Sequence, residues 1–149
     1  MKTYKINGLS ASGTGPKTAG TLIGSTAIRA LLNYALFGFR TNPNTTDQQV
    51  ECAVSNTTTA GTAGSNPTPK PDDPQDVAAV VTAGITHSAE PTLGANFMDF
   101  DLNQRASKEW GAQDGREIAG AATASNTVSS RMVGVTAALQ LSCVMGWRE

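Results

Sequence analysis

The chain has 149 residues and a formal net charge of −1, and only 15% of its residues are charged, against about 25% in an average soluble domain. This length predicts one domain covering residues 1–149. The balanced charge excludes the basic surface of a nucleic-acid-binding domain and any polyacidic or polybasic tail. Aromatic residues make up 5% of the chain, so we expect a thin core built partly from small side chains.

The N-terminal part of the sequence predicts two strands separated by turns. Tyr4 and Ile6 share one face of a short strand, and the glycine-rich residues 8–20 predict turns. The apolar spacing in residues 26–39 fits both a helix and a strand, and periodicity alone favours a helix. We predict a strand, because the neighbouring elements are strands and because Gly24 and Gly38 bound the run.

The middle of the chain combines one strand with a long loop. Residues 48–54 predict a strand with Val50, Cys52 and Val54 on one face. Residues 55–76 are rich in proline, threonine and glycine and contain almost no apolar side chain, which predicts a long extended loop suited to lie on a neighbouring molecule. An Asp-Pro pair at residues 73–74 has the form of a helix N-cap and predicts one short helix over residues 74–81.

The C-terminal half predicts further strands. Alternation in residues 97–102 and 105–110 predicts two strands, and the Asp114-Gly115 pair is a hairpin signal. Residues 133–147 carry apolar side chains at every second position, which predicts one long strand. Together the elements predict an all-β fold, a single-domain β-sandwich or jelly-roll-like barrel of about seven or eight strands with one short helix and long loops.

Few residues have the chemistry of a catalytic or metal site. His87 is the only histidine, which excludes a multi-histidine metal site, and we expect it to be an ordinary loop residue. Asp99 and Asp101 project from one face of a strand, which suits a solvated face or, alternatively, a glycosidase pair or a Ca²⁺ ion. We interpret Cys52 and Cys143 as small core residues. The sequence therefore predicts no catalytic, cofactor or metal site, and a protein that is not an enzyme.

Two tryptophans and two arginines are the candidate interface residues. Trp110 and Trp147 lie on predicted strands as anchors either of the core or of a subunit interface. Arg105 and Arg131 are expected to open strands and to form surface or interface ion pairs. No segment has the apolar length of a signal peptide or of a membrane-spanning helix, so we expect no membrane partner.

Two runs carry a resemblance to a known group of proteins. The sequence His-Ser-Ala-Glu-Pro-Thr at residues 87–92, followed by Leu-Asn-Gln-Arg-Ala at residues 102–106 and by Trp110, resembles a pattern in small proteins encoded in the structural-gene regions of tailed bacteriophages. The similarity extends in order over most of the chain, from Thr-Ala-Ile-Arg at residues 26–29 onward. The chain departs from the pattern at Lys-Glu in residues 108–109.

This resemblance implies a virion structural protein, and within that class a cement or decoration protein clamped onto the outside of an icosahedral head. The implied partners are the major capsid protein and further copies of the chain, as a homotrimer at threefold junctions of capsomers. The implied location is the outer capsid surface, after synthesis in the host bacterial cytoplasm. Residues 55–71 and 2–16 are the expected capsid-contacting arms, and the strand edges near Arg105 and Arg131 are the expected trimer contacts.

Two alternatives remain at this point. A head-to-tail connector or tail structural protein would assemble as sixfold or twelvefold rings. A carbohydrate-binding module on the virion surface would use an exposed Trp110 or Trp147 together with Asp99 and Asp101. Solvent exposure of the two tryptophans distinguishes this second alternative, because a sugar can stack only on an exposed ring.

Overall fold

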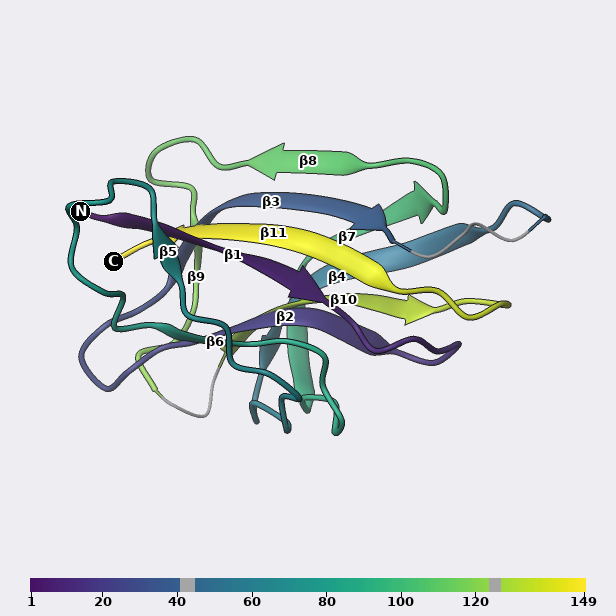
Figure 1. Cartoon of the computed structure of the whole chain (residues 1–149), viewed down its shortest axis with the longest axis horizontal. Coiled ribbons are helices and arrows are strands. Elements are labelled where there is room, and N and C mark those ends of the chain that lie inside the picture. The colour runs from purple at the N-terminus through teal and green to yellow at the C-terminus, as the bar shows by residue number, and fades with distance from the viewer. Residues whose placement is uncertain (41–44, 124–126) are drawn as a thin grey trace.

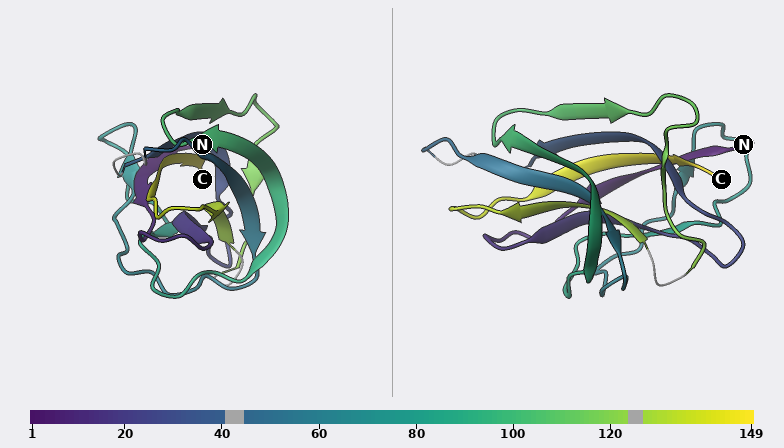
Figure 2. Two further views of the ribbon diagram at one scale, coloured as in Figure 1. Left: turned by 90° about the vertical axis from the view of Figure 1, so that its right-hand side faces the viewer. Right: turned by 180° about the vertical axis from the view of Figure 1, so that it is seen from behind.

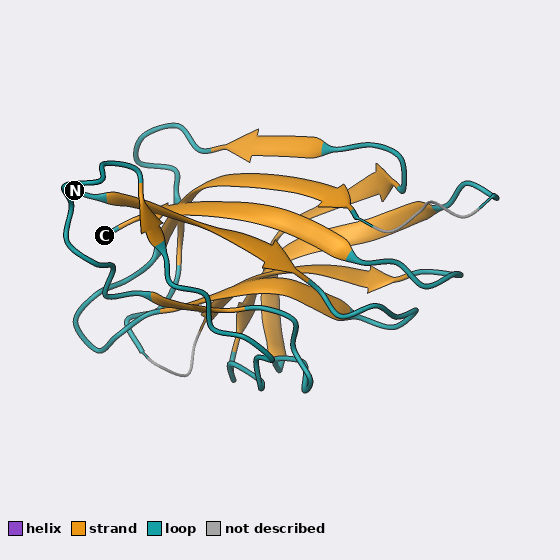
Figure 3. Cartoon of the chain, viewed as in Figure 1, coloured by secondary structure: helices purple, strands orange, loops and turns teal. Residues whose placement is uncertain are grey.

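The computed structural model describes residues 1–40, 45–123 and 127–149, and all regular structure within them is strand (Figure 3). Two antiparallel sheets pack face to face, with the N- and C-termini side by side at one end (Figure 1). Views along the strands and from behind show the two layers and the loops that leave them (Figure 2). The predicted all-β sandwich is therefore confirmed, while the single domain and the jelly-roll-like connectivity remain predictions.

The first sheet contains both ends of the chain. Its order is β5 (Lys70–Pro71), β1 (Thr3–Leu9), β11 (Leu141–Arg148), β3 (Leu31–Phe39) and β8 (Lys108–Gly111), and β9 (Ile118–Ala119) also pairs with β3. The second sheet has the order β6 (Thr82–Gly84), β2 (Lys17–Ile23), β10 (Thr127–Gly134), β4 (Gln49–Thr57) and β7 (Leu93–Asn103). The first and last long strands, β1 and β11, are hydrogen-bonded neighbours, so both termini are held within the sheet.

The longer strands change sheet at each step along the chain except between β4 and β7, which are neighbours in the second sheet. When the two- and three-residue strands β5, β6 and β9 are set aside, the first sheet reads β1-β11-β3-β8 and the second β2-β10-β4-β7. These strands pair side by side within each sheet: β1 with β11 and β3 with β8 in the first, and β2 with β10 and β4 with β7 in the second.

The core lies between the sheets and follows the period-two alternation of the strands. On β11 alternate residues from 141 to 147 point inward, and Trp147 has no exposed surface. The Trp147 ring stacks on Tyr4 with centroids 6.0 Å apart, and Phe37 meets Phe100 edge to face at 4.9 Å, so each aromatic pair joins neighbouring parts of the thin core.

Small residues let the two sheets approach closely. A Cβ atom on Gly8 would lie 2.6 Å from the Ala19 carbonyl oxygen and 2.7 Å from Cys143 Sγ, so glycine is required there. Cys52 and Cys143 are free and buried, which confirms their interpretation as core residues. Burial raises the pKa of the Cys52 thiol to about 12 and that of Cys143 to about 11, so both stay protonated.

The structure corrects several local predictions in the first half of the chain. Residues 26–39 do contain a strand, β3, as predicted, but the expected turns at 8–20 include most of β2. Eleven strands occur among the described residues instead of seven or eight, and the excess corresponds to the three very short ones. The prediction of a short helix over residues 74–81 is wrong. Asp73 caps a single turn through Gln75 N, and the chain then extends because Glu149 binds the amides of residues 80 and 81.

Two predictions in the C-terminal half are also wrong in detail. The single strand over residues 133–147 is two strands, because the chain passes from the second sheet to the first through residues 135–140. Leu139 in that passage is buried and bridges Gly13, so the apolar alternation continues where the strand does not. The Asp114-Gly115 turn does not join a hairpin, since β8 and β9 both pair with β3 rather than with each other.

Candidate functional site

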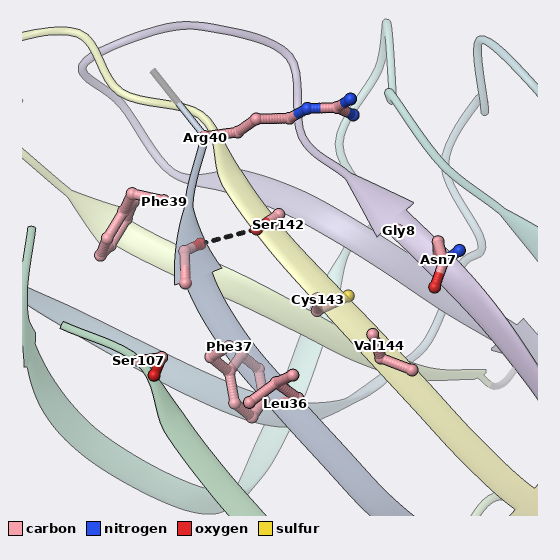
Figure 4. A pocket seen from close by; sticks show the side chains of 11 residues that line it. Asn7, Gly8, Leu36, Phe37, Phe39, Arg40, Ser107, Ser142, Cys143 and Val144 are labelled. Carbon is pink, nitrogen blue, oxygen red and sulfur yellow. Dashed lines mark hydrogen bonds between the residues drawn. The ribbon is translucent and has the colours of Figure 1, made fainter. Parts of the chain in front are cut away.

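The outer face of the first sheet carries an open hollow that we call the trough. It occupies about 410 Å³ over β1, β3 and β11. Leu36 and Val144 form its apolar floor, and Arg40 lies at its rim (Figure 4). Gly38 and Ser142 also line the hollow, and their small size leaves it open. Hollows of about 430 and 330 Å³ share residues with it at either end, so the depression continues across the sheet. A broad open surface of this kind suits a protein partner better than an enclosed small molecule.

The trough has a positive rim. Arg40 is exposed and forms no ion pair with a described residue. Arg105 lines one end, where its Nε donates to Asp47 Oδ1 at 2.6 Å and this bond lowers the pKa of the Asp47 carboxyl. Lys5 lines the other end and pairs with Asp72 at 2.9 Å. Of these three rim cations, Arg40 is therefore the one without a carboxylate partner among the described residues, and it lines the same hollow as Leu36 and Val144.

The outer face of the second sheet has the opposite charge. Glu51 on β4 lies directly across from Asp101 on β7, with Asp99 two residues away, and the three carboxylates line a hollow of about 360 Å³. Glu51 and Asp101 form no ion pair with a described residue. Phe97 is 46% exposed on the same edge strand. We call Glu51, Phe97, Asp99 and Asp101 together the acidic face.

A polar network supports this face from β10. Arg131 Nε donates to Ser55 Oγ at 3.2 Å, and Ser55 Oγ donates to Asn96 Oδ1 at 2.7 Å. Asn96 in turn donates to Asp99 Oδ1 at 2.7 Å. Arg131 lies inside β10 rather than at its start, so that prediction is corrected. The network fixes Asp99, but it leaves Glu51 and Asp101 facing solvent.

The tryptophans have different positions. Trp147 is fully buried between the sheets, which confirms its role as a core anchor and corrects the alternative that it lies at an interface. Trp110 on β8 is partly buried and packs against the core. Arg105 lies in the turn between β7 and β8 rather than opening a strand. Arg105 and Arg131 thus belong to different surfaces, the trough and the acidic face, and their roles at an interface remain predictions.

Residues 58–92, which we call the wrapping segment, run from β4 to β7 along the side of β1 and β2. The segment supplies β5 beside β1 and β6 beside β2. Tyr4 Oη donates to the Val77 carbonyl at 3.0 Å, and the Glu149 carboxylate accepts the amides of Val80 and Val81 at 2.9 and 2.8 Å. Within the predicted loop over residues 55–76, residues 55–57 therefore belong to β4 and residues 70–71 form β5 beside β1.

His87 anchors the wrapping segment on β2. Its ring is buried, with Nε2 3.4 Å from Thr21 Oγ1, and burial lowers its pKa while the Glu90 carboxylate and the Thr18 backbone oppose that effect. Thr21 is fully buried and donates its hydroxyl proton to the Gly84 carbonyl at 3.3 Å. The hydroxyl is therefore neither accessible nor activated by the imidazole, and this Thr-His-Glu group is structural.

Part of the wrapping segment projects from the sandwich, and we call residues 58–66 with 85–92 the foot (Figure 1). Its two strips are joined by bridges between Thr62 and Ala89 and between Ser65 and Ile85. Gly61 adopts φ 69° where a Cβ would lie 2.5 Å from the Ala89 carbonyl, so its conformation requires glycine. The exposed residues of the foot are small and uncharged: Thr58, Thr59, Gly61, Thr62, Gly64, Ser65, Asn66, Thr86, Ser88, Ala89 and Thr92.

The N-terminal arm predicted over residues 2–16 is only partly a loop, because β1 (Thr3–Leu9) lies between β5 and β11 inside the first sheet. Its contact with a capsid stays a prediction. Only residues 10–16 form a connecting loop, and Gly13 in it bridges Leu139. Residues 58–66 of the other predicted arm form one strip of the foot.

Sequence reasoning did not select several residues of these surfaces. Val144 was not recognised because it lies on the face of β11 that otherwise carries small and polar side chains. Arg40 and Phe97 gave no motif, and Glu51 approaches Asp101 only through the pairing of β4 with β7. An apolar residue on the polar face of an alternating strand was the one available signal.

No group of three or more His, Cys, Asp and Glu side chains in the described residues is arranged to hold a metal ion. The same residues include no helix long and apolar enough to cross a membrane. Comparisons with family models, with curated proteins and with solved structures found no match to the chain.

Proposed function

We propose that the protein is a virion structural protein, and specifically a capsid decoration or cement protein that binds the outside of the icosahedral head of a tailed bacteriophage. Its partners in this proposal are the major capsid protein and further copies of the chain, as a homotrimer. Its role is mechanical rather than catalytic: it joins neighbouring capsid subunits against the outward pressure of packaged DNA. The resemblance at residues 87–92 and 102–106 and the strand order support this proposal.

The strand order is the observation that carries most weight. One sheet has the order β1-β11-β3-β8 and the other the order β2-β10-β4-β7. We propose that these eight strands form a jelly roll, a sandwich built from two Greek keys. Jelly rolls occur in viral capsid proteins, lectin domains and cupins. Because a fold hosts many functions, this is an argument by analogy, and the surface must supply the rest.

The foot supplies a surface suited to capsid binding. Its exposed residues are uncharged and rich in hydroxyl groups. The foot is held on the sandwich by His87 and by the Thr86 amide, which donates to the Leu9 carbonyl at 2.8 Å. A pre-ordered loop loses little conformational entropy on binding. Modest contacts in each copy suffice, because copies that also bind each other engage the lattice at high effective concentration.

The two alternatives fare differently. A head-to-tail connector or tail protein remains a candidate with the same fold, and it differs in copy number and symmetry. The carbohydrate-binding alternative has lost its main feature, since the Trp147 ring is buried and Trp110 packs against the core. Asp99 is also held by Asn96 rather than free to bind a sugar hydroxyl.

A charged bulky residue on the foot tests the proposed contact. Thr62→Arg adds a long side chain at an exposed position whose backbone bonds to Ala89 are kept. We expect this variant to fold normally and to lose most of its binding to purified heads that lack the protein, as measured by co-sedimentation. Gln113→Arg, in an exposed turn of the sandwich outside the foot, is the matched control and should bind like the wild type. Equal binding by both variants would remove the foot from the capsid contact.

A further inference from the structure

We propose that the trough of one copy receives the acidic face of a second copy, in a head-to-tail contact. This inference deepens the self-association in the proposed function and rests on it for its biological setting. The contact itself is argued from two surfaces of the described chain that complement each other in both shape and charge.

The apolar parts of the two surfaces match. Phe97 is a large side chain, 46% exposed, on an edge strand that is paired on one side only. The trough offers an open hollow of about 410 Å³ that Leu36 and Val144 line with apolar side chains (Figure 4). An exposed aromatic anchor that enters a shallow apolar hollow is a common centre of a protein interface.

The charges of the two surfaces are opposite. Among the described residues, Arg40 at the rim of the trough forms no ion pair with a carboxylate, and Glu51 and Asp101 form none with a cation. Glu51 and Asp101 also lie directly opposite each other, a like-charge arrangement that destabilises a sheet until a cation approaches. A guanidinium of a second copy, placed in the hollow of about 360 Å³ beside them, would relieve this repulsion.

The spacing of the two features is the same on both surfaces. Arg40 follows Leu36 by four residues, and Asp101 follows Phe97 by four residues. In extended chain four residues span about 13 Å. When Phe97 of one copy lies over Leu36 of another, Asp101 is therefore placed near Arg40 in the same contact. The apolar contact and the charge pair therefore favour the same alignment of the two copies. Neither surface is complementary to itself, so the contact joins two different surfaces.

When the trough of one copy binds the acidic face of another, the pair still has one free trough and one free acidic face. Such heterologous contacts either close into a ring or continue as an open chain, depending on the rotation between copies. The contact also leaves the foot outside the interface, because the foot belongs to neither surface. Self-association and capsid binding are consequently separable by mutation.

Charge reversal with a reciprocal swap tests the proposal on the purified full-length chain. We expect the wild type to self-associate with rising concentration in sedimentation velocity, and to dissociate as salt is added. Arg40→Glu and Asp101→Arg should each weaken association at least about tenfold, and the double variant should recover most of the loss, because the swapped charges attract again. Phe97→Ser should also weaken association, without change in folding.

Matched controls keep the test specific. Arg116→Glu reverses an exposed arginine outside the trough, and Val77→Ser removes an exposed apolar side chain outside the acidic face; both should associate like the wild type. A wild type that stays monomeric up to about 100 μM at low salt, single variants no weaker than the controls, or a double variant without recovery would each overturn the proposal. None of these results affects where the protein lies on a virion, so failure here is distinct from failure of the proposed function.

Discussion

The sandwich and the wrapping segment are held in place by different forces. Between the sheets, stability comes from buried apolar area and from close approach at small residues such as Gly8. In the wrapping segment most side chains are small and exposed, and a few polar anchors position the chain: His87 on Thr21, and Glu149 on the amides of Val80 and Val81. The sandwich should therefore respond to changes in volume, and the segment to changes in hydrogen bonding and protonation.

The largest effect is expected from the core. Trp147→Ala removes a fully buried ring, its stacking on Tyr4 and the bond from Nε1 to Glu149 Oε1 at 3.3 Å. We expect the free energy of unfolding to fall by about 3–5 kcal/mol. Trp110→Ala, at a partly buried position, should cost clearly less. Urea denaturation followed by circular dichroism measures both, and equal losses would contradict the assignment of Trp147 as the core anchor.

A smaller effect is expected where the sheets approach each other. Gly8→Ala places a Cβ within 2.7 Å of both the Ala19 carbonyl oxygen and Cys143 Sγ, so the sheets must move apart. The expected loss in free energy of unfolding is about 1–3 kcal/mol. Gly15→Ala is the control, because no atom lies within 4 Å of its added Cβ, and it should change stability by less than about 0.5 kcal/mol. If Gly8→Ala left the free energy of unfolding unchanged, the sheets would not be in close contact there.

The wrapping segment provides the smallest and most local effect. Because burial lowers the pKa of His87 below the 6.5 of an unfolded histidine, the released segment binds a proton more readily than the docked one. Docking is therefore fully stable above pH 6.5 and weakens as the pH falls from there toward the lowered pKa. The Glu90 carboxylate, which pairs with Lys17 at 3.7 Å, acts against this lowering of the His87 pKa.

Hydrogen exchange of residues 84–91 measures this effect. Their amides should exchange faster at pH 5 than at pH 7, after correction for intrinsic rates, while the amides of β11 show little change. His87→Gln keeps a polar group and cannot be protonated, so it should remove most of the difference. An unchanged difference in that variant would show that another group controls docking.

The sequence predicts the sandwich better than it predicts the connections. Strand alternation locates β1, β4, β7 and β11 because each has one face against the core, and β3 follows from its neighbours although its periodicity also fits a helix. The same signal fails at residues 135–140, where Leu139 is buried in a passage between sheets. β2 is missed because the close approach of the sheets requires Ala19 and Gly20 in place of bulky strand residues.

The surfaces depend on contacts that are distant in sequence. Asp99 and Asp101 were predicted to share a face, but Glu51 joins them only through strand pairing, and Arg131 reaches Asn96 across β4. The helix over residues 74–81 fails for the same reason, since its competitor is the carboxylate of Glu149 at the far end of the chain. Propensity and periodicity along a short stretch of sequence cannot predict contacts with residues so distant in the chain.

The most direct test of the account is electron microscopy of intact virions that carry the protein, with its copy number counted and its position located. The account predicts several hundred copies on the outer capsid surface at threefold positions, with the foot toward the capsid. A dozen or fewer copies at a single vertex would contradict the decoration function and favour the connector, and absence from the particle would contradict a virion role altogether.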